Sequence, residues 1–287
     1  MKAALIIVDV QNDFLEKGAL PVKDAHDIIP HINKVRNEYA NRFTTVFTTQ
    51  QHRQETHIAF NDSPYAHEEN LPFDEITLAV KGKFPRYCVQ GTNGANFAPE
   101  MQLKGDEVLI RKDEDKFKEE MSAFQNPIVP EVLNTNKIKL VFVVGLTLDF
   151  CVGLTAIDSA KRGFETYVIQ ECTKPLGDQS GEAMKKNFEK NNVKLITMEQ
   201  FDEIIKKAEE IKKEEEKVEP SQTAMEEEKK ASEEKPPEEK PTEEKPPEEK
   251  PPEQKPPEEK PPEEKPPEEK PPEEKPPEEK PPEEKKE

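Results

Sequence analysis

Short apolar runs alternate with longer amphipathic segments over the first 210 residues. Residues 3–8 contain no polar side chain, a pattern that predicts a strand buried on both faces of a parallel sheet. Similar runs predict further strands at residues 44–49, 107–110, 139–144, 166–169 and 193–198. Apolar positions at helical spacing predict helices at residues 25–40, 151–162, 181–190 and 198–217.

This alternation predicts the fold class. Strands and helices of these lengths, following one another along the chain, favour an α/β fold: a three-layer α/β/α sandwich with a central, mostly parallel sheet. The stretch from residue 50 to about residue 105 has no clear period and is expected to be rich in loops. In sheets of this kind the functional site lies beyond the carboxyl ends of the strands.

The C-terminal part of the chain has a different composition. From Pro236 to Lys285 it consists of ten tandem copies of Pro-Pro-Glu-Glu-Lys, with Thr242 and Gln254 as departures. Frequent proline and the lack of apolar side chains predict a disordered, extended tail. We therefore expect a folded domain at residues 1–210, a charged linker at 211–235 and a disordered repeat tail at 236–287. A solvated spacer and a docking segment both remain open for the tail.

Charge and cysteine content exclude several classes of protein. The net charge is −19, and residues 210–287 contribute −13 of it, so the folded part is only mildly acidic. Without a basic stripe, nucleic acid is not an expected partner. No apolar run reaches the roughly 18–20 residues that cross a bilayer, and the start of the chain lacks a secretory h-region. Three cysteines do not form a disulfide framework, so we expect a cytoplasmic protein.

Three reactive side chains follow predicted strands. Asp9 follows the first strand, Lys112 follows the strand at 107–110, and Cys151 begins a helix after the strand at 139–144. A thiolate is stabilised by a cation and a helix N-terminus, and a carboxylate can carry its proton to a leaving group. Together they would perform acyl transfer through a thioester. Position alone leaves ordinary alternatives open: a turn aspartate, a surface lysine and a buried cysteine.

Five segments have a more specific sequence: Ile-Val-Asp-Val-Gln-Asn-Asp-Phe at 7–14, Val-Gln-Gly-Thr-Asn-Gly-Ala-Asn-Phe-Ala-Pro at 89–99, Ser-Ala-Phe at 122–124, Gly-Leu-Thr-Leu-Asp-Phe-Cys-Val at 145–152 and Thr-Ala-Ile-Asp-Ser-Ala at 155–160. In order and spacing they closely resemble the nicotinamidase branch of the isochorismatase-like cysteine hydrolases. The resemblance covers roughly residues 1–200. It implies a cysteine amidohydrolase that converts nicotinamide to nicotinate and ammonia through a thioester, in NAD salvage.

The resemblance also implies roles for individual residues. Cys151 would be the nucleophile, Asp9 the general base and acid, and Lys112 the electrostatic support of a catalytic triad. A cis peptide bond between residues 146 and 147 would aim the backbone N–H groups of Thr147 and Cys151 at the developing oxyanion. An aromatic pair sandwiches the pyridine ring in this branch, and the matching residues are Phe14 and Phe84.

The chain departs from this branch at its metal site. Nicotinamidases bind a metal through one aspartate and three histidines. The matching residues here are Gln51, Arg53, His57 and Tyr87, so His57 is the one retained ligand. An arginine is permanently charged and does not ligate a divalent ion. His52 is a weak substitute, so the sequence predicts a degenerate divalent-metal site and no cofactor.

These departures leave alternatives for the function. Arg53 or Tyr87 would replace the metal as hydrogen-bond donor to the ring nitrogen, which would keep nicotinamide as the substrate. Otherwise the pocket accepts another small amide, and a guanidinium would suit an anionic one. A catalytically silent scaffold with a charged tail is the remaining alternative. The expected partner is a small-molecule amide, while a homo-oligomer and a partner for the tail stay open.

Overall fold

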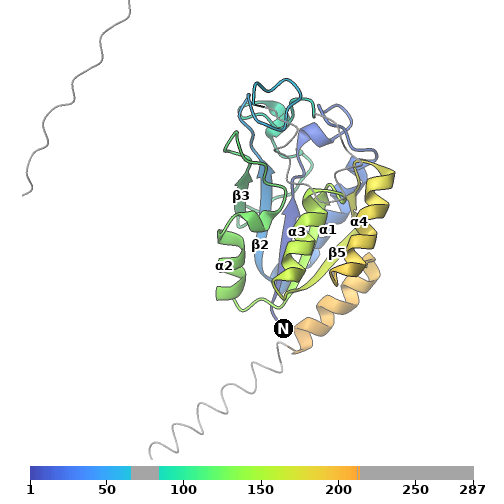
Figure 1. Cartoon of the computed structure of the whole chain (residues 1–287). Helices are drawn as coiled ribbons and strands as arrows, with labels where there is room; N and C mark the ends of the chain where they lie inside the picture. Colours follow the sequence, from blue (N-terminus) through green and yellow to red (C-terminus); the bar gives the residue numbers. More distant parts are fainter. Residues whose placement is uncertain (66–83, 212, 214–287) are drawn as a thin grey trace, which may run out of the picture. The chain divides into compact units, whose positions relative to one another are not determined.

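The computed structural model describes residues 1–65, 84–211 and 213 (Figure 1). The predicted linker, from residue 214 onward, and the repeat tail lie outside the described residues, as do residues 66–83 of the long loop. The last predicted helix is described over residues 198–211, and its predicted end at residue 217 falls outside.

A six-stranded sheet forms the centre of the domain, with the order β3-β2-β1-β4-β5-β6. All five strand pairings are parallel. The strands are β1 (Ala3–Val8), β2 (Phe43–Gln51), β3 (Val108–Lys112), β4 (Leu140–Leu146), β5 (Glu165–Lys174) and β6 (Lys194–Ile196). The chain builds outward from β1 to β3 and then crosses back to β4, so the strand order reverses between β1 and β4. Ligands of open α/β sheets bind beside such a reversal point.

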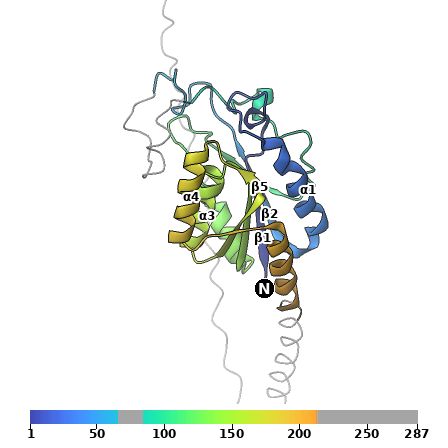
Figure 2. The same cartoon turned by 90° about the vertical axis from the view of Figure 1, so that its right-hand side faces the viewer.

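Helices cover both faces of this sheet (Figure 2). On one face lie α1 (Ile28–Glu38) and the helix of residues 198–211, and on the other α3 (Cys151–Lys161) and α4 (Asp178–Lys190). The short helix α2 (Ile128–Thr135) packs into the same core as α3 and α4. The predicted three-layer α/β/α sandwich is therefore confirmed. Among the described residues, no helix combines the length and the apolar character needed to cross a membrane.

The side chains of β1 divide the hydrophobic core into two halves. Leu5 and Ile7 point into the core shared with α1, while Ile6 and Val8 point into the core shared with α3 and α4. None of these side chains is more than 1% exposed. Burial on both faces is the reason the first apolar run contains no polar residue.

Several predicted boundaries differ from the structure. Strand β5 runs to Lys174, five residues beyond its predicted end, and α4 begins at Asp178 rather than at residue 181. The predicted strand at 193–198 is only three residues long. Helix α2 was not expected from the sequence, because eight residues that include Pro130 give little helical period.

Gly145 allows β4 to approach β1 closely at the edge where the candidate residues gather. Its φ of +113° is a backbone conformation that glycine adopts without strain. A Cβ at this position would lie 2.0 Å from the carbonyl oxygen of Val8. In the strand register Val8 is the partner of Gly145. The ends of β1 and β4 are consequently held side by side, one residue before Asp9 and a few residues before Cys151.

We expect the helix of residues 198–211 to be an integral part of the domain. Phe201 on this helix is 0% exposed and meets the rings of Tyr39, Phe43 and Phe142. Phe201→Ala should therefore lower the free energy of unfolding by about 3–5 kcal/mol, measured by urea denaturation. Glu203→Ala, an exposed change on the same helix, should stay within about 0.5 kcal/mol. Equal effects of the two changes would contradict the packing described here.

Candidate active site

Asp9 is the first residue after β1 and adopts a left-handed backbone conformation, with φ +47°. Its side chain is fully buried. Carboxylate oxygen Oδ1 accepts a hydrogen bond from the hydroxyl of Thr49 at 2.6 Å, and Oδ2 accepts one from Lys112 Nζ at 2.7 Å. The carboxylate thus has a fixed orientation at the carboxyl edge of the sheet.

Lys112 is the last residue of β3 and is 1% exposed. Besides Asp9, its ammonium donates to the backbone carbonyl of Met121 at 3.1 Å. Burial acts to lower the pKa of Lys112, but the nearby Asp9 carboxylate and Cys151 outweigh it, so the net shift is upward. Lys112 therefore remains a cation next to Asp9.

Cys151 is the first residue of α3, and its side chain is buried. Its sulfur lies 3.2 Å from Nε2 of Gln51, which donates to it, and 3.7 Å from the sulfur of Met121. Burial raises the pKa of the Cys151 thiol and Asp9 adds to the rise, while Lys112 acts in the opposite direction. The resting group is a thiol that needs a proton acceptor before it can act as a nucleophile.

The turn between β4 and α3 leads directly into Cys151 and is closed by backbone hydrogen bonds. The peptide bond between Leu146 and Thr147 is cis, as the resemblance implies. The carbonyl of Thr147 accepts hydrogen bonds from the N–H groups of Phe150 and Val152, which closes the turn. Cys151 starts its helix, so its own N–H has no partner within that helix.

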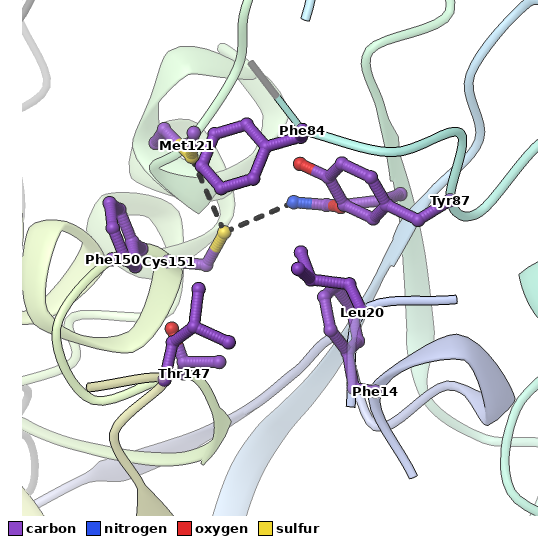
Figure 3. A pocket seen from close by; sticks show the side chains of 10 residues that line it. Phe14, Leu20, Phe84, Tyr87, Met121, Thr147, Phe150 and Cys151 are labelled. Carbon is purple, nitrogen blue, oxygen red and sulfur yellow. Dashed lines mark hydrogen bonds between the residues drawn. The ribbon is translucent and has the colours of Figure 1, made fainter. Parts of the chain in front are cut away.

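A narrow cavity opens beside the Cys151 sulfur (Figure 3). Its free volume is about 20 Å³, room for about one water molecule and far below the roughly 300–1,000 Å³ of an open ligand pocket. An aromatic ligand therefore requires the lining side chains to move apart. The lining is mostly apolar and aromatic, with Gln51 and Thr147 as polar members; its other residues are Phe14, Leu20, Phe84, Tyr87, Met121, Phe150, Cys151 and Leu176.

Aromatic rings meet edge to face in the wall of this cavity. The ring of Tyr87 is 5.7 Å from that of Phe14 and 5.8 Å from that of Phe84. The Tyr87 hydroxyl points into the cavity (Figure 3) and has no hydrogen-bond partner among the described residues. It is a donor available to a ligand.

Behind Tyr87 lies a buried polar cluster around Arg53. Both terminal nitrogens of Arg53 donate to Glu119, each at 2.7 Å, and one of them also donates to Nδ1 of His57 at 2.9 Å. The other lies 2.9 Å from Oδ2 of Asp113 as an ion pair, without the alignment of a hydrogen bond. The guanidinium carbon sits 4.6 Å from the centre of the Tyr87 ring.

The pKa shifts in this cluster follow from burial and from the guanidinium. Burial lowers the pKa of His57 to about 4, and Arg53 adds to the effect, so the imidazole is neutral. Burial acts to raise the pKa of Glu119, yet Arg53 outweighs it and the net shift is downward. For Asp113, burial raises the pKa and the charge of Glu119 adds to that rise.

The structure thus brings most of the sequence-predicted residues to one place. Asp9, Lys112 and Cys151 are connected through hydrogen bonds and close contacts, and Thr147 and three aromatic residues line the adjacent cavity. Arg53 does not line the cavity but lies behind it. His52 is apart from the buried cluster and pairs with Glu114 instead.

Two residues of the cluster were not found by sequence reasoning. Asp113 and Glu119 lie in a charged stretch, residues 112–120, that reads as solvent-exposed, and yet both are buried. Their burial could have been predicted only indirectly, from Arg53: a buried arginine in the site requires buried carboxylates nearby. Gln51, which the sequence marks only as a lost metal ligand, contacts the Cys151 sulfur and leaves its own Oε1 without a partner among the described residues.

Residues of the motifs at 7–14 and 89–99 connect the end of β1 to the segment that carries Tyr87. The side chain of Gln11 binds the backbone of Gln51 and Ala95, and Asp13 accepts the N–H of Cys88 at 2.7 Å. Gly94 leaves room for the Asp13 carboxylate, since a Cβ would lie 2.0 Å from it. These contacts hold the segment that carries Tyr87 against the end of β1.

A parallel α/β sheet with a thiol, a carboxylate and an ammonium at its carboxyl edge is the arrangement that the resemblance implies for a cysteine hydrolase. A family comparison agrees: residues 3–200 match the isochorismatase domain, and the chain belongs to this family of hydrolases. The resemblance seen in the sequence is thereby confirmed. Among curated relatives, the nicotinamidase of Acinetobacter baylyi is 36% identical over 186 residues, which cover 62% of this chain and 83% of the relative.

Solved structures give the same result. A nicotinamidase from Acinetobacter baumanii matches with a TM-score of 0.60 and 32% identity, covering 70% of this chain and 98% of the other. The pyrazinamidase of Pyrococcus horikoshii, solved in complex with zinc, matches with a TM-score of 0.59 and 30% identity. That match covers 69% of this chain and all of the pyrazinamidase.

The electrostatic environment of Cys151 predicts opposite effects of two substitutions. Asp9→Asn removes a negative charge that raises the thiol pKa, so iodoacetamide should label Cys151 at lower pH than in the parent chain. Lys112→Met removes the cation that lowers this pKa, so labelling should require higher pH. Peptide mass spectrometry across a pH series measures both, with Cys172, a buried thiol without a nearby cation, as internal control. A shift of both variants in the same direction would contradict this account.

Proposed function

We propose that this chain hydrolyses nicotinamide to nicotinate and ammonia, as a step of pyridine nucleotide salvage in a reducing cytoplasm. The observation that carries the proposal is the convergence of Asp9, Lys112 and Cys151 beside a cavity walled by aromatic rings. Relatives named as nicotinamidases, and the three free cysteines of the chain, support it further.

In the proposed reaction Asp9 acts first as a base. It takes the proton of Cys151, and the thiolate attacks the carboxamide carbon to form a C–S bond. Lys112, whose Nζ lies 2.7 Å from Oδ2 of Asp9, holds the carboxylate in position for the transfer. The negative charge that develops on the amide oxygen is stabilised by the N–H groups of Thr147 and Cys151.

Asp9 then acts as an acid. It returns the proton to the amide nitrogen, the C–N bond breaks, and ammonia leaves a thioester of nicotinic acid on Cys151. A water molecule replaces ammonia, gives its proton to Asp9 and attacks the thioester carbon. The C–S bond breaks and Asp9 returns the proton to the sulfur. Nicotinic acid leaves and loses its own proton to solvent as nicotinate, with the enzyme in its starting state.

The aromatic wall would position the pyridine ring. Phe14 and Phe84 lie on different sides of the cavity and can contact the ring once the side chains move apart (Figure 3). The Tyr87 hydroxyl, which points into the same space, would donate to the ring nitrogen. Arg53 would then support substrate binding through the ring of Tyr87 rather than by direct contact.

We further propose that the reaction needs no metal ion. Arg53, Gln51 and Tyr87 stand at three of the positions where the resemblance implies ligands. The other potential ligands in this region, including His57, are already engaged by the Arg53 guanidinium. Ammonia release should consequently be unchanged after treatment with a chelator such as EDTA, and a loss that added zinc restores would contradict this part of the proposal.

A second candidate is the hydrolysis of another small aromatic amide. It is favoured by Tyr87, a neutral donor at a position where the resemblance implies a metal ligand, because a phenol also recognises partners other than a pyridine nitrogen. The contacts among Asp9, Lys112 and Cys151 argue against a catalytically silent scaffold.

The decisive measurement is the release of ammonia and nicotinate from nicotinamide by the purified full chain. We expect turnover in the parent chain and none above background in Cys151→Ala, because no other thiol lies beside the cavity. Cys172→Ala, a change at a buried thiol away from the cavity, should retain turnover. If the parent chain releases no ammonia from nicotinamide, the proposal fails, and a panel of small amides then tests the second candidate.

Tyr87→Phe tests the donor to the ring nitrogen. Loss of one neutral hydrogen bond should lower kcat/KM for nicotinamide by about 3- to 10-fold. Benzamide has no ring nitrogen, so its hydrolysis by the parent chain and by the variant should be equal. Equal losses for both substrates would mean that the hydroxyl serves the protein structure and does not recognise the pyridine.

A further inference from the structure

Three potential metal ligands form a buried group behind Tyr87. His57, Asp113 and Glu119 are 0%, 0% and 7% exposed, and their ligand atoms lie within 4.8 Å of one another. One imidazole nitrogen with two carboxylates is a donor set that suits zinc and related divalent ions. The three ligand atoms are thus close enough together to bind one ion.

A protein cation already occupies this group. Nη1 of Arg53 lies 2.7 Å from Oε2 of Glu119 and 2.9 Å from Nδ1 of His57. Nη2 lies 2.7 Å from Oε1 of Glu119 and 2.9 Å from Oδ2 of Asp113. These are the atoms that a metal would use. Arg53 is 0% exposed, so its charge is balanced inside the protein and not by solvent.

The orientation of His57 strengthens this interpretation. Its Nε2 lies 3.0 Å from the backbone carbonyl of Lys118, to which it donates, so the neutral ring presents Nδ1 as an acceptor. A histidine that ligates a metal is commonly held in this way, with its second nitrogen donating to a carbonyl or a carboxylate. Here the acceptor nitrogen faces Arg53 and the N–H of Ala59.

We infer that Arg53 is a resident cation in a latent metal site, and that removal of its guanidinium opens this site to one divalent ion of the zinc class. The buried Glu119 carboxylate needs positive charge beside it. A guanidinium and a metal ion both supply it, but they would compete for the same oxygen and nitrogen atoms. With Arg53 in place, the chain is expected to exclude the ion.

The inference concerns binding and stands independently of the proposed reaction. It connects to the cavity through Tyr87, whose ring lies 4.6 Å from the guanidinium carbon of Arg53. The Arg53 guanidinium therefore lies among the three potential ligands and also packs against the Tyr87 ring. Because this positive charge belongs to a side chain, a chelator does not remove it.

Cobalt(II) is the probe for the test, because its visible absorption reports coordination by protein ligands without any assay of activity. The full-length parent chain, Arg53→Ala and Arg53→Lys are titrated with Co²⁺, and uptake is measured after dialysis. Arg53→Lys is the matched control, since it keeps a positive charge at the same place. The double variant Arg53→Ala/His57→Ala removes one of the inferred ligands.

We expect Arg53→Ala to bind about one equivalent of Co²⁺, which Zn²⁺ displaces, and to gain thermal stability with either ion. The parent chain and Arg53→Lys should take up none. The double variant should lose the absorption band. If Arg53→Ala unfolds without metal and refolds when Zn²⁺ is added, the inference is supported as well.

Two results would overturn it. One is stoichiometric uptake of Co²⁺ by the parent chain that disappears in His57→Ala, because the guanidinium would then not occupy the site. The other is an Arg53→Ala variant without Co²⁺ or Zn²⁺ binding, whether it is folded or stays unfolded in the presence of the ions, because the three ligands would then not form a metal site.

Discussion

The buried ion pair between Asp9 and Lys112 is the interaction on which the rest of the site depends. It joins the ends of β1 and β3 across β2, whose Thr49 hydroxyl holds the other carboxylate oxygen. Two buried charges lose much solvation and persist only with close partners. Both side chains have them: Asp9 also receives the Thr49 hydroxyl, and Lys112 also donates to Met121. The pair fixes the place where a thiol at the start of α3 can give up its proton.

The end of β3 carries two neighbouring charged residues that contact different groups. Lys112 faces Asp9, while the next residue, Asp113, has a φ of +61° and faces Arg53. A change of backbone direction between neighbouring residues thus separates the proton-carrying group from the cluster behind Tyr87. The two groups still influence one another through space, since the charge of Lys112 acts on the pKa of both Asp113 and Glu119.

Elements defined by a local sequence pattern were predicted well, and features that depend on contacts between distant residues were not. Strand β1 matched its predicted bounds, because a strand buried on both faces leaves a continuous apolar run. The short helix α2 left no such pattern, and β5 continued five residues past its predicted end. Asp149 illustrates the difficulty: it accepts the N–H groups of Leu176 and Gly177 ahead of α4, a contact across nearly thirty residues that no local pattern reveals.

The sequence by itself determined the family, the three-layer architecture and the order of Asp9, Lys112 and Cys151 along the chain. These follow from apolar periodicity and from motifs whose residues are close together in the sequence. Only the tertiary structure decided that Asp113 and Glu119 are buried, that they hold Arg53, and that Arg53 lies behind Tyr87 and not in the cavity. A charged residue has the same letter on the surface and in the interior. The role of Arg53 is set by Glu119, sixty-six residues away, which only the folded chain brings within hydrogen-bond distance.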